Sequence, residues 1–106
     1  MKNKFEVKYS PEFYNDFYTI NFYIKHKLKN SIASDNLLKR VEKEIKKRAL
    51  NPLGYEQYKT NAGNTYYRIY IKNYIVFYTL TNNVMEVRRI VYSRRDLDKL
   101  IWKLRN

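Results

Sequence analysis

The stretch that most constrains the fold runs from Tyr66 to Asp96 and is dense in β-branched and aromatic residues, which suit a pleated, half-buried surface. Short polar breaks at Ile71–Asn73 and Asn82–Asn83 divide it into three pieces of strand length. Because an asparagine pair tolerates the positive φ angles of tight hairpins, these breaks predict antiparallel neighbours. The middle piece, Tyr74–Leu80, is almost continuously apolar, which predicts a central strand covered on both faces.

Arginines interrupt the apolar pattern of this predicted sheet at Arg68, Arg88 and Arg89. The last strand loses its alternation at the arginine pair, which predicts either a bulge or the open end of a concave face. The 22 Lys and Arg residues outnumber the 10 Asp and Glu residues and give a formal net charge of +12. That excess favours polyanionic partners and fast, salt-sensitive association, although a lysine-rich surface can also be merely solvated.

The residues before the sheet predict one strand and two helices. Phe5–Tyr9 alternates apolar and polar residues, as a half-buried strand does. Ser10 and Pro11 predict a helix start, with Ser as the N-cap and Pro at the first helical position. The apolar stripe that follows predicts a helix to about Leu28. The stripe consists of Phe13, Phe17, Ile20 and Ile24, widened by Tyr14 and Tyr18.

A second periodic segment follows the polar break Lys29–Ser31 and ends at Asn51–Pro52, because proline disfavours a helical conformation in the residue before it. Helices joined by so short a loop pack antiparallel. Leu53–Asn64 holds both glycines and predicts a loop, and Ser93–Leu104 predicts a C-terminal helix that opens with a capping-box pattern. The apolar face of the second helix is formed by Leu37, Leu38, Val41, Ile45 and Ala49.

These elements predict one domain spanning residues 1–106. Its class is α+β, with a helical hairpin packed on a mostly antiparallel four-stranded sheet. The chain has no cysteine, which excludes disulfides and thiolate metal sites, and its single histidine cannot form a metal cluster alone. We expect no metal and no cofactor. The sequence shows no signal-peptide pattern and no apolar run of membrane-spanning length, so we expect a cytoplasmic protein with no membrane partner.

The order strand, two helices, loop, three strands, helix occurs together with the motifs Tyr67-Arg68, Asn73–Tyr78 and Arg89–Asp96. In these features, and in Ser10-Pro11 and Pro52, the chain resembles the RelE/ParE superfamily of toxins from bacterial type II toxin–antitoxin modules. The resemblance implies a cognate antitoxin that wraps the toxin, and contact with operator DNA only through the toxin–antitoxin complex. It also implies one of two targets. RelE-like members cleave mRNA in the ribosomal A site, whereas ParE-like members inhibit DNA gyrase.

A RelE-like activity would need proton transfer at the RNA 2′-hydroxyl and cations that stabilise the developing phosphorane charge. By position in the motifs, the resemblance implies two sets of site residues. The catalytic set is Arg68, Tyr92 and Arg94, and the RNA-binding set is Lys59, Arg89 and Arg95. Salt bridging at a helix end is an alternative role for Arg94 and Arg95.

The sequence leaves three functions open. The first, which we favour from the sequence, is a ribosome-dependent mRNA endonuclease that arrests translation. The second is a non-catalytic toxin that binds DNA gyrase. The third is a basic RNA-binding module without toxicity. The motifs do not distinguish the first two targets, and they do not identify the general base.

Overall fold

The computed structural model of the protein describes residues 5–55, 57–59 and 63–93. Its elements, in chain order, are β1 (Glu6–Tyr9), α1 (Pro11–Phe22), the helical turn η1 (Tyr23–Lys27), α2 (Ser31–Ala49), β2 (Gln57–Lys59), β3 (Thr65–Ile71), β4 (Tyr74–Thr81) and β5 (Val84–Tyr92). The strands form one sheet in the order β1-β5-β4-β3-β2. Among the strand pairs of the described residues, only β1–β5 is parallel, so the mostly antiparallel α+β fold is confirmed.

The sheet has one strand more than the sequence predicts, because β2 lies within the predicted loop Leu53–Asn64. β2 is three residues long and pairs with β3 from Gln57↔Tyr67 to Lys59↔Thr65. Three residues are too few to show an alternating pattern, so hydropathy alone could not reveal it. The predicted C-terminal helix, from Arg94 onward, lies outside the described residues.

The start of α1 follows the sequence prediction. Ser10 is the N-cap, its Oγ accepts a hydrogen bond from the Phe13 N–H at 3.1 Å, and Pro11 occupies the first turn. The helix continues into η1, where the wider hydrogen bond from the Leu28 N–H to the Tyr23 carbonyl closes the last turn at 3.1 Å. The predicted end near Leu28 is therefore confirmed.

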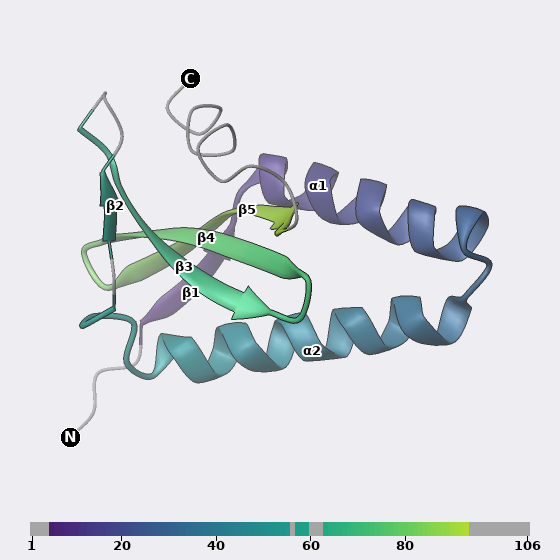
Figure 1. Ribbon diagram of the computed structural model, residues 1–106. Helices are drawn as coiled ribbons and strands as arrows, with labels where there is room; N and C mark the ends of the chain where they lie inside the picture. Colours follow the sequence, from purple (N-terminus) through teal and green to yellow (C-terminus); the bar gives the residue numbers. More distant parts are fainter. Residues whose placement is uncertain (1–4, 56, 60–62, 94–106) are drawn as a thin grey trace.

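The helical hairpin is completed by α2. Asn30 caps it through a 3.0 Å hydrogen bond from the Ala33 N–H to Oδ1. Figure 1 shows α1 and α2 running antiparallel, with their connection lying beyond the end of the strands. No helix among the described residues is long and apolar enough to cross a membrane.

The main core lies between this hairpin and one face of the sheet. It includes Phe13, Val41 and Ile45 from the helices and Tyr78 and Val87 from the strands. The stripe predicted for the helices is wider than the buried one: Tyr14 and Tyr18 are 59% and 69% exposed, and Leu38 is 43% exposed. A second, smaller buried cluster consists of Tyr66, Ile75 and Phe77, with Val91 packed against it. It lies on the opposite face, since neighbouring residues of a strand point to opposite sides.

Two predicted irregularities of the sheet are present. The β4–β5 turn has positive φ angles at both asparagines, 49° at Asn82 and 64° at Asn83. The β4–β5 register then shifts by one residue, because Tyr78 faces Val87 whereas Phe77 faces Arg89. Arg88 is therefore the extra residue of a β-bulge.

The Asn83→Ala substitution should lower the free energy of unfolding by about 1 kcal/mol, because a Cβ without a local hydrogen-bonding group is disfavoured at positive φ. Asn83→Gly should be close to neutral, since glycine adopts this conformation readily. Urea denaturation of both variants measures the difference. An alanine variant as stable as the glycine variant would contradict this account of the turn.

Candidate functional site

The strand registers divide the predicted site residues between the two faces of the sheet. Arg68 of β3 faces Phe77 of β4, and Phe77 faces Arg89 of β5. These three side chains share a row on the face opposite the helices, since their strand neighbours Ile69 and Ile90 belong to the main core. The structure therefore brings Arg68 and Arg89 onto one face.

Tyr92 lies on the other face. It pairs with Tyr74, their ring centroids are 5.6 Å apart, and Tyr74 packs against the helix-side core. Lys59 pairs with Thr65, which lies two residues before Tyr67 of the main core. Lys59 therefore projects to the helix side of the sheet, where it is exposed. Arg94 and Arg95 lie outside the described residues.

Arg68 is almost buried, with 8% of its surface exposed. Its guanidinium carbon lies 5.2 Å from the centroid of the Tyr70 ring, a distance that suits a cation–π interaction. Tyr70 is 57% exposed, and it lies on the same face because it is two residues further along β3. An anion that approached Arg68 along this surface would therefore meet the ring of Tyr70.

Arg89 is held by an acidic residue of α1. Its Nε and Nη2 donate to the two carboxylate oxygens of Asp16 at 2.5 and 2.9 Å. The Asp16 carboxylate also accepts the Ile90 N–H at 3.2 Å. The hydrogen bonds to Asp16 raise the pKa of Arg89 above its ordinary value. This bidentate pair joins α1 to β5 just beyond the β1–β5 pairing, which ends at Val87.

Another arginine, Arg48 at the end of α2, joins the helical hairpin to the strands, and the sequence analysis missed it. Arg48 Nη1 donates to the Arg68 carbonyl at 2.9 Å and to the Tyr78 hydroxyl at 3.0 Å. The Arg48 guanidinium carbon lies 3.6 Å from the Tyr55 ring centroid. Spacing could have found Arg48, because it follows the buried Ile45 by three residues and so shares its face.

The Tyr78 hydroxyl connects this arginine to the chain after α2. It donates to the Pro52 carbonyl at 2.8 Å. Burial raises the pKa of Tyr78, and the hydrogen bond from Arg48 opposes that shift. The phenol therefore stays protonated at neutral pH and serves as a structural donor and acceptor.

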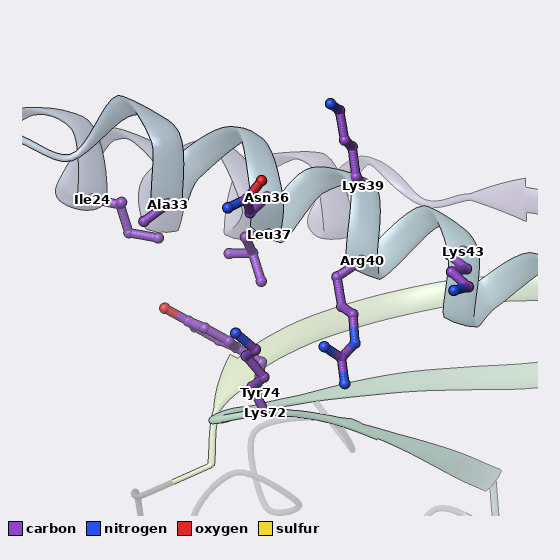
Figure 2. Close-up of a pocket in the computed structure, with 9 residues that line it drawn as sticks. All are labelled: Ile24, Ala33, Asn36, Leu37, Lys39, Arg40, Lys43, Lys72 and Tyr74. Carbon is purple, nitrogen blue, oxygen red and sulfur yellow. The ribbon is translucent and has the colours of Figure 1, made fainter.

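Two hollows flank Tyr74 beneath the helical hairpin, and we call them together the Tyr74 groove. One, of about 570 Å³, lies between α2 and the β3–β4 turn and is lined in part by Ile24 and Leu37 (Figure 2). The other, of about 610 Å³, is lined in part by Tyr23 and Tyr92. Burial raises the pKa of Tyr74, and the neighbouring Tyr92 and Tyr23 raise it further. Tyr92 thus belongs to this groove.

This arrangement limits the chemistry that the predicted residues can perform together. RNA cleavage needs one group that stabilises the phosphorane charge and another that moves the proton of the 2′-hydroxyl. Both groups must lie at the same phosphate. Arg68 and Tyr92 point to opposite faces and lie three residue rows apart along the strands, roughly 10 Å at the rise of an extended chain. Within the described ranges, no group of three or more His, Asp or Glu side chains could hold a metal ion.

Residues 7–97 match the family model described as the ParE toxin of the type II toxin–antitoxin system parDE. Among solved structures, the chain is similar to one from the RelB–RelE antitoxin–toxin complex of Methanococcus jannaschii, with 20% identity, 88% of this chain and 98% of that chain covered, and a TM-score of 0.49. It is also similar to YafQ of E. coli, with 18% identity, coverage of 86% and 96%, and a TM-score of 0.49. No curated protein sequence matches the chain.

Proposed function

The chain belongs to the family of ParE toxins of type II toxin–antitoxin systems, and from this premise we propose that it arrests growth by binding DNA gyrase without cleaving nucleic acid. A cognate antitoxin neutralises it, and operator DNA is contacted only through the toxin–antitoxin complex. The net charge of +12 supports an acidic partner, because oppositely charged surfaces steer and orient such complexes. Gyrase is a cytoplasmic target, so the toxin acts in the cytoplasm.

One observation carries the choice of a binding toxin over an enzyme. Arg68 and Tyr92, the charge stabiliser and proton-exchanging group of the nuclease hypothesis, project from opposite faces of the sheet. A binding toxin needs no such pair, because it acts through surface complementarity alone.

A second candidate is a ribosome-dependent mRNA endonuclease, and the row Arg68–Phe77–Arg89 favours it. Two arginines on one face can stabilise charge on one backbone phosphate or on neighbouring ones. In this function, Arg68, Tyr92 and Arg94 act on the scissile phosphate, and Lys59, Arg89 and Arg95 contact the RNA. The ribosome then supplies the positioning that the toxin lacks.

We expect purified protein to inhibit supercoiling by gyrase, and we expect no new mRNA ends after its expression in cells. Arg68→Ala should leave gyrase inhibition within about twofold, since this side chain is almost buried and most contacts outside a few central residues contribute little affinity. Gel assays of plasmid supercoiling and primer extension on a translated message measure the two activities.

The nuclease hypothesis predicts the reverse. New mRNA ends appear, supercoiling is unaffected, and Arg68→Ala lowers the cleavage rate on the order of a hundred- to a thousandfold, as removal of one positioned charge stabiliser does. Tyr92→Phe, which removes only a hydroxyl, then loses part of the rate. If neither activity occurs and cells grow normally, the protein is not a toxin, and the third function, RNA binding without toxicity, becomes the better explanation.

A further inference from the structure

The exposed side of α1 carries an unbroken row of aromatic side chains. Tyr14, Tyr18 and Phe22 follow one another at four-residue spacing and are 59%, 69% and 51% exposed. Residues four apart are neighbours on a helix surface, so their rings form one stripe, which we call the aromatic row. Single exposed apolar residues are common on monomeric proteins, whereas a contiguous set of them marks an interaction surface.

The rings of the aromatic row are held by their neighbours. The ring centroids of Tyr18 and Phe22 are 6.2 Å apart, and the Phe22 ring lies 4.3 Å from that of His26 in η1. Tyr14 lies 6.0 Å from the buried Phe13. Side chains that are already ordered lose little conformational entropy when a partner covers them. The aromatic row is therefore preorganised for packing against another surface.

The charges beside the aromatic row have opposite signs at its two ends. Glu12 lies in the first turn of α1, whereas Lys25 and Lys27 lie in η1 at the other end, and all three are exposed. Position 20 is the centre between Tyr18 and Phe22. Glu12 lies eight positions before this centre and Lys27 seven positions after it, so the opposite charges are almost equally far from the middle of the row.

We propose that the aromatic row is the contact surface of a homodimer, in which α1 of one copy packs antiparallel on α1 of a second copy. The two-fold axis passes near position 20, and the rings of each copy enter the spaces between the rings of the other. A two-fold interface brings one surface against itself, so that surface must be self-complementary. The antiparallel arrangement meets this condition, because it places Glu12 of each copy beside Lys25 and Lys27 of the other.

The charge distribution favours a second copy over nucleic acid. Single strands stack their bases on aromatic rings, but their backbone also needs cations along its path. Helix α1 contains no Lys or Arg, and its two charged residues, Glu12 and Asp16, are both acidic. A backbone phosphate that followed the aromatic row would therefore meet carboxylates before it reached the lysines of η1.

The same feature explains how two copies of a chain with a net charge of +12 can meet. Contact through α1 brings together the segment that has no cation, and charges further apart than about 8 Å are screened at physiological ionic strength. A half-exposed aromatic side chain offers roughly 100 Å², so three rings from each copy bury roughly 600 Å² before their neighbours are counted. Standard interfaces bury roughly 1,600 Å², and we therefore expect a weak dimer.

Sedimentation of the full chain over a range of concentrations measures the dimer. The wild type should change from monomer to dimer at concentrations on the order of 10 μM or higher, as a small interface implies. Tyr18→Asp should weaken association by about tenfold or more, because it buries a carboxylate among rings. The matched control is Tyr70→Asp, the same change at a tyrosine that is 57% exposed on the face opposite the helices, and it should change association by less than about twofold.

A charge exchange tests the antiparallel orientation. Glu12→Lys and Lys27→Glu each put like charges together at both ends of the dimer and should weaken association by about threefold to tenfold. The double variant Glu12→Lys/Lys27→Glu exchanges the two charges and should return to within about twofold of the wild type. In a parallel dimer each charge meets its own copy, so neither single variant would change association. Thermal unfolding confirms that each variant is folded.

Four results would overturn the proposal, and none of them depends on the target of the toxin. The wild type stays monomeric throughout the concentration range, or Tyr18→Asp associates as the wild type does, or the double variant is no better than the single ones. The fourth is a monomeric wild type that binds a single-stranded DNA oligonucleotide and loses this binding in Tyr18→Asp, which would assign the aromatic row to nucleic acid.

Discussion

Asp16→Ala should lower the free energy of unfolding by about 3 kcal/mol. The variant leaves Arg89 without its bidentate partner and leaves the Ile90 N–H without its acceptor. Removing one member of a buried pair costs about 3–5 kcal/mol. The side chains of Arg89 and Asp16 are 29% and 17% exposed, so solvent screening places the expected loss at the lower end of that range. Urea denaturation gives the value.

Two variants show which part of the interaction matters. Asp16→Asn keeps an acceptor for the Ile90 N–H but loses the charge, so it should lose roughly half as much stability. Glu86→Ala removes the partner of Arg88 in an exposed pair of the same strand, at 3.6 Å, and should cost less than about 1 kcal/mol. An Asp16→Ala loss no larger than that of Glu86→Ala would show that the α1–β5 junction does not depend on this pair.

The pH dependence of this interaction follows from the sign of the Arg89 shift. The pKa of Arg89 is raised in the folded protein. Its stabilisation is therefore fully present below the ordinary arginine pKa, and it is lost only as the pH rises through the higher folded value. Arg89 should contribute no change in stability across the neutral range.

Arg48→Ala should also lower the free energy of unfolding by about 3 kcal/mol. The substitution removes two hydrogen bonds from a charged donor, to the Arg68 carbonyl and the Tyr78 hydroxyl, and such bonds contribute about 1.5–3 kcal/mol each. It also removes the cation–π contact with Tyr55. The Tyr78 hydroxyl keeps its bond to the Pro52 carbonyl, which limits the loss.

The control for Arg48 lies on the same helix. Arg40→Ala removes an exposed arginine whose ion pair with Glu44 is 3.9 Å long and should change stability by less than about 0.5 kcal/mol. Arg48→Lys keeps the charge but not the planar fork that reaches two acceptors at once, so it should restore less than half of the loss. Hydrogen exchange at Gln57–Lys59 should accelerate in Arg48→Ala, because Tyr55 is then released from α2. An unchanged exchange rate there would show that the contact between Arg48 and Tyr55 does not hold this segment against α2.

Most of the backbone fold could be predicted from short sequence motifs. Ser10-Pro11 set the start of α1, and the asparagine pair set the β4–β5 turn. The short turn after Ile71 also fixes the β3–β4 register, since Ile71 faces Tyr74 and Arg68 then faces Phe77. Each of these features depends on residues close together in the sequence.

The arrangement of the candidate site was harder to predict from the sequence. It depends on which face of the sheet each strand residue points to and on partners that are distant along the chain. Arg89 and Tyr92 are three positions apart, so a regular strand already places them on opposite faces. The bulge at Arg88 decides which of them shares a face with Arg68. The partner of Arg89, by contrast, is Asp16, 73 positions away, and one sequence contains no signal for that pairing.

The parallel pairing of β1 with β5 has a consequence for the order of assembly during synthesis. Within the described sheet, β1 pairs only with β5, and the Ser10 hydroxyl donates to the Arg88 carbonyl 78 positions later. Contacts this distant along the chain form slowly and cannot form before both ends exist. The helices therefore leave the ribosome first, with the apolar residues of the main core uncovered. A message truncated before Val84 yields a nascent chain that lacks the strand joining β1 and α1 to the sheet.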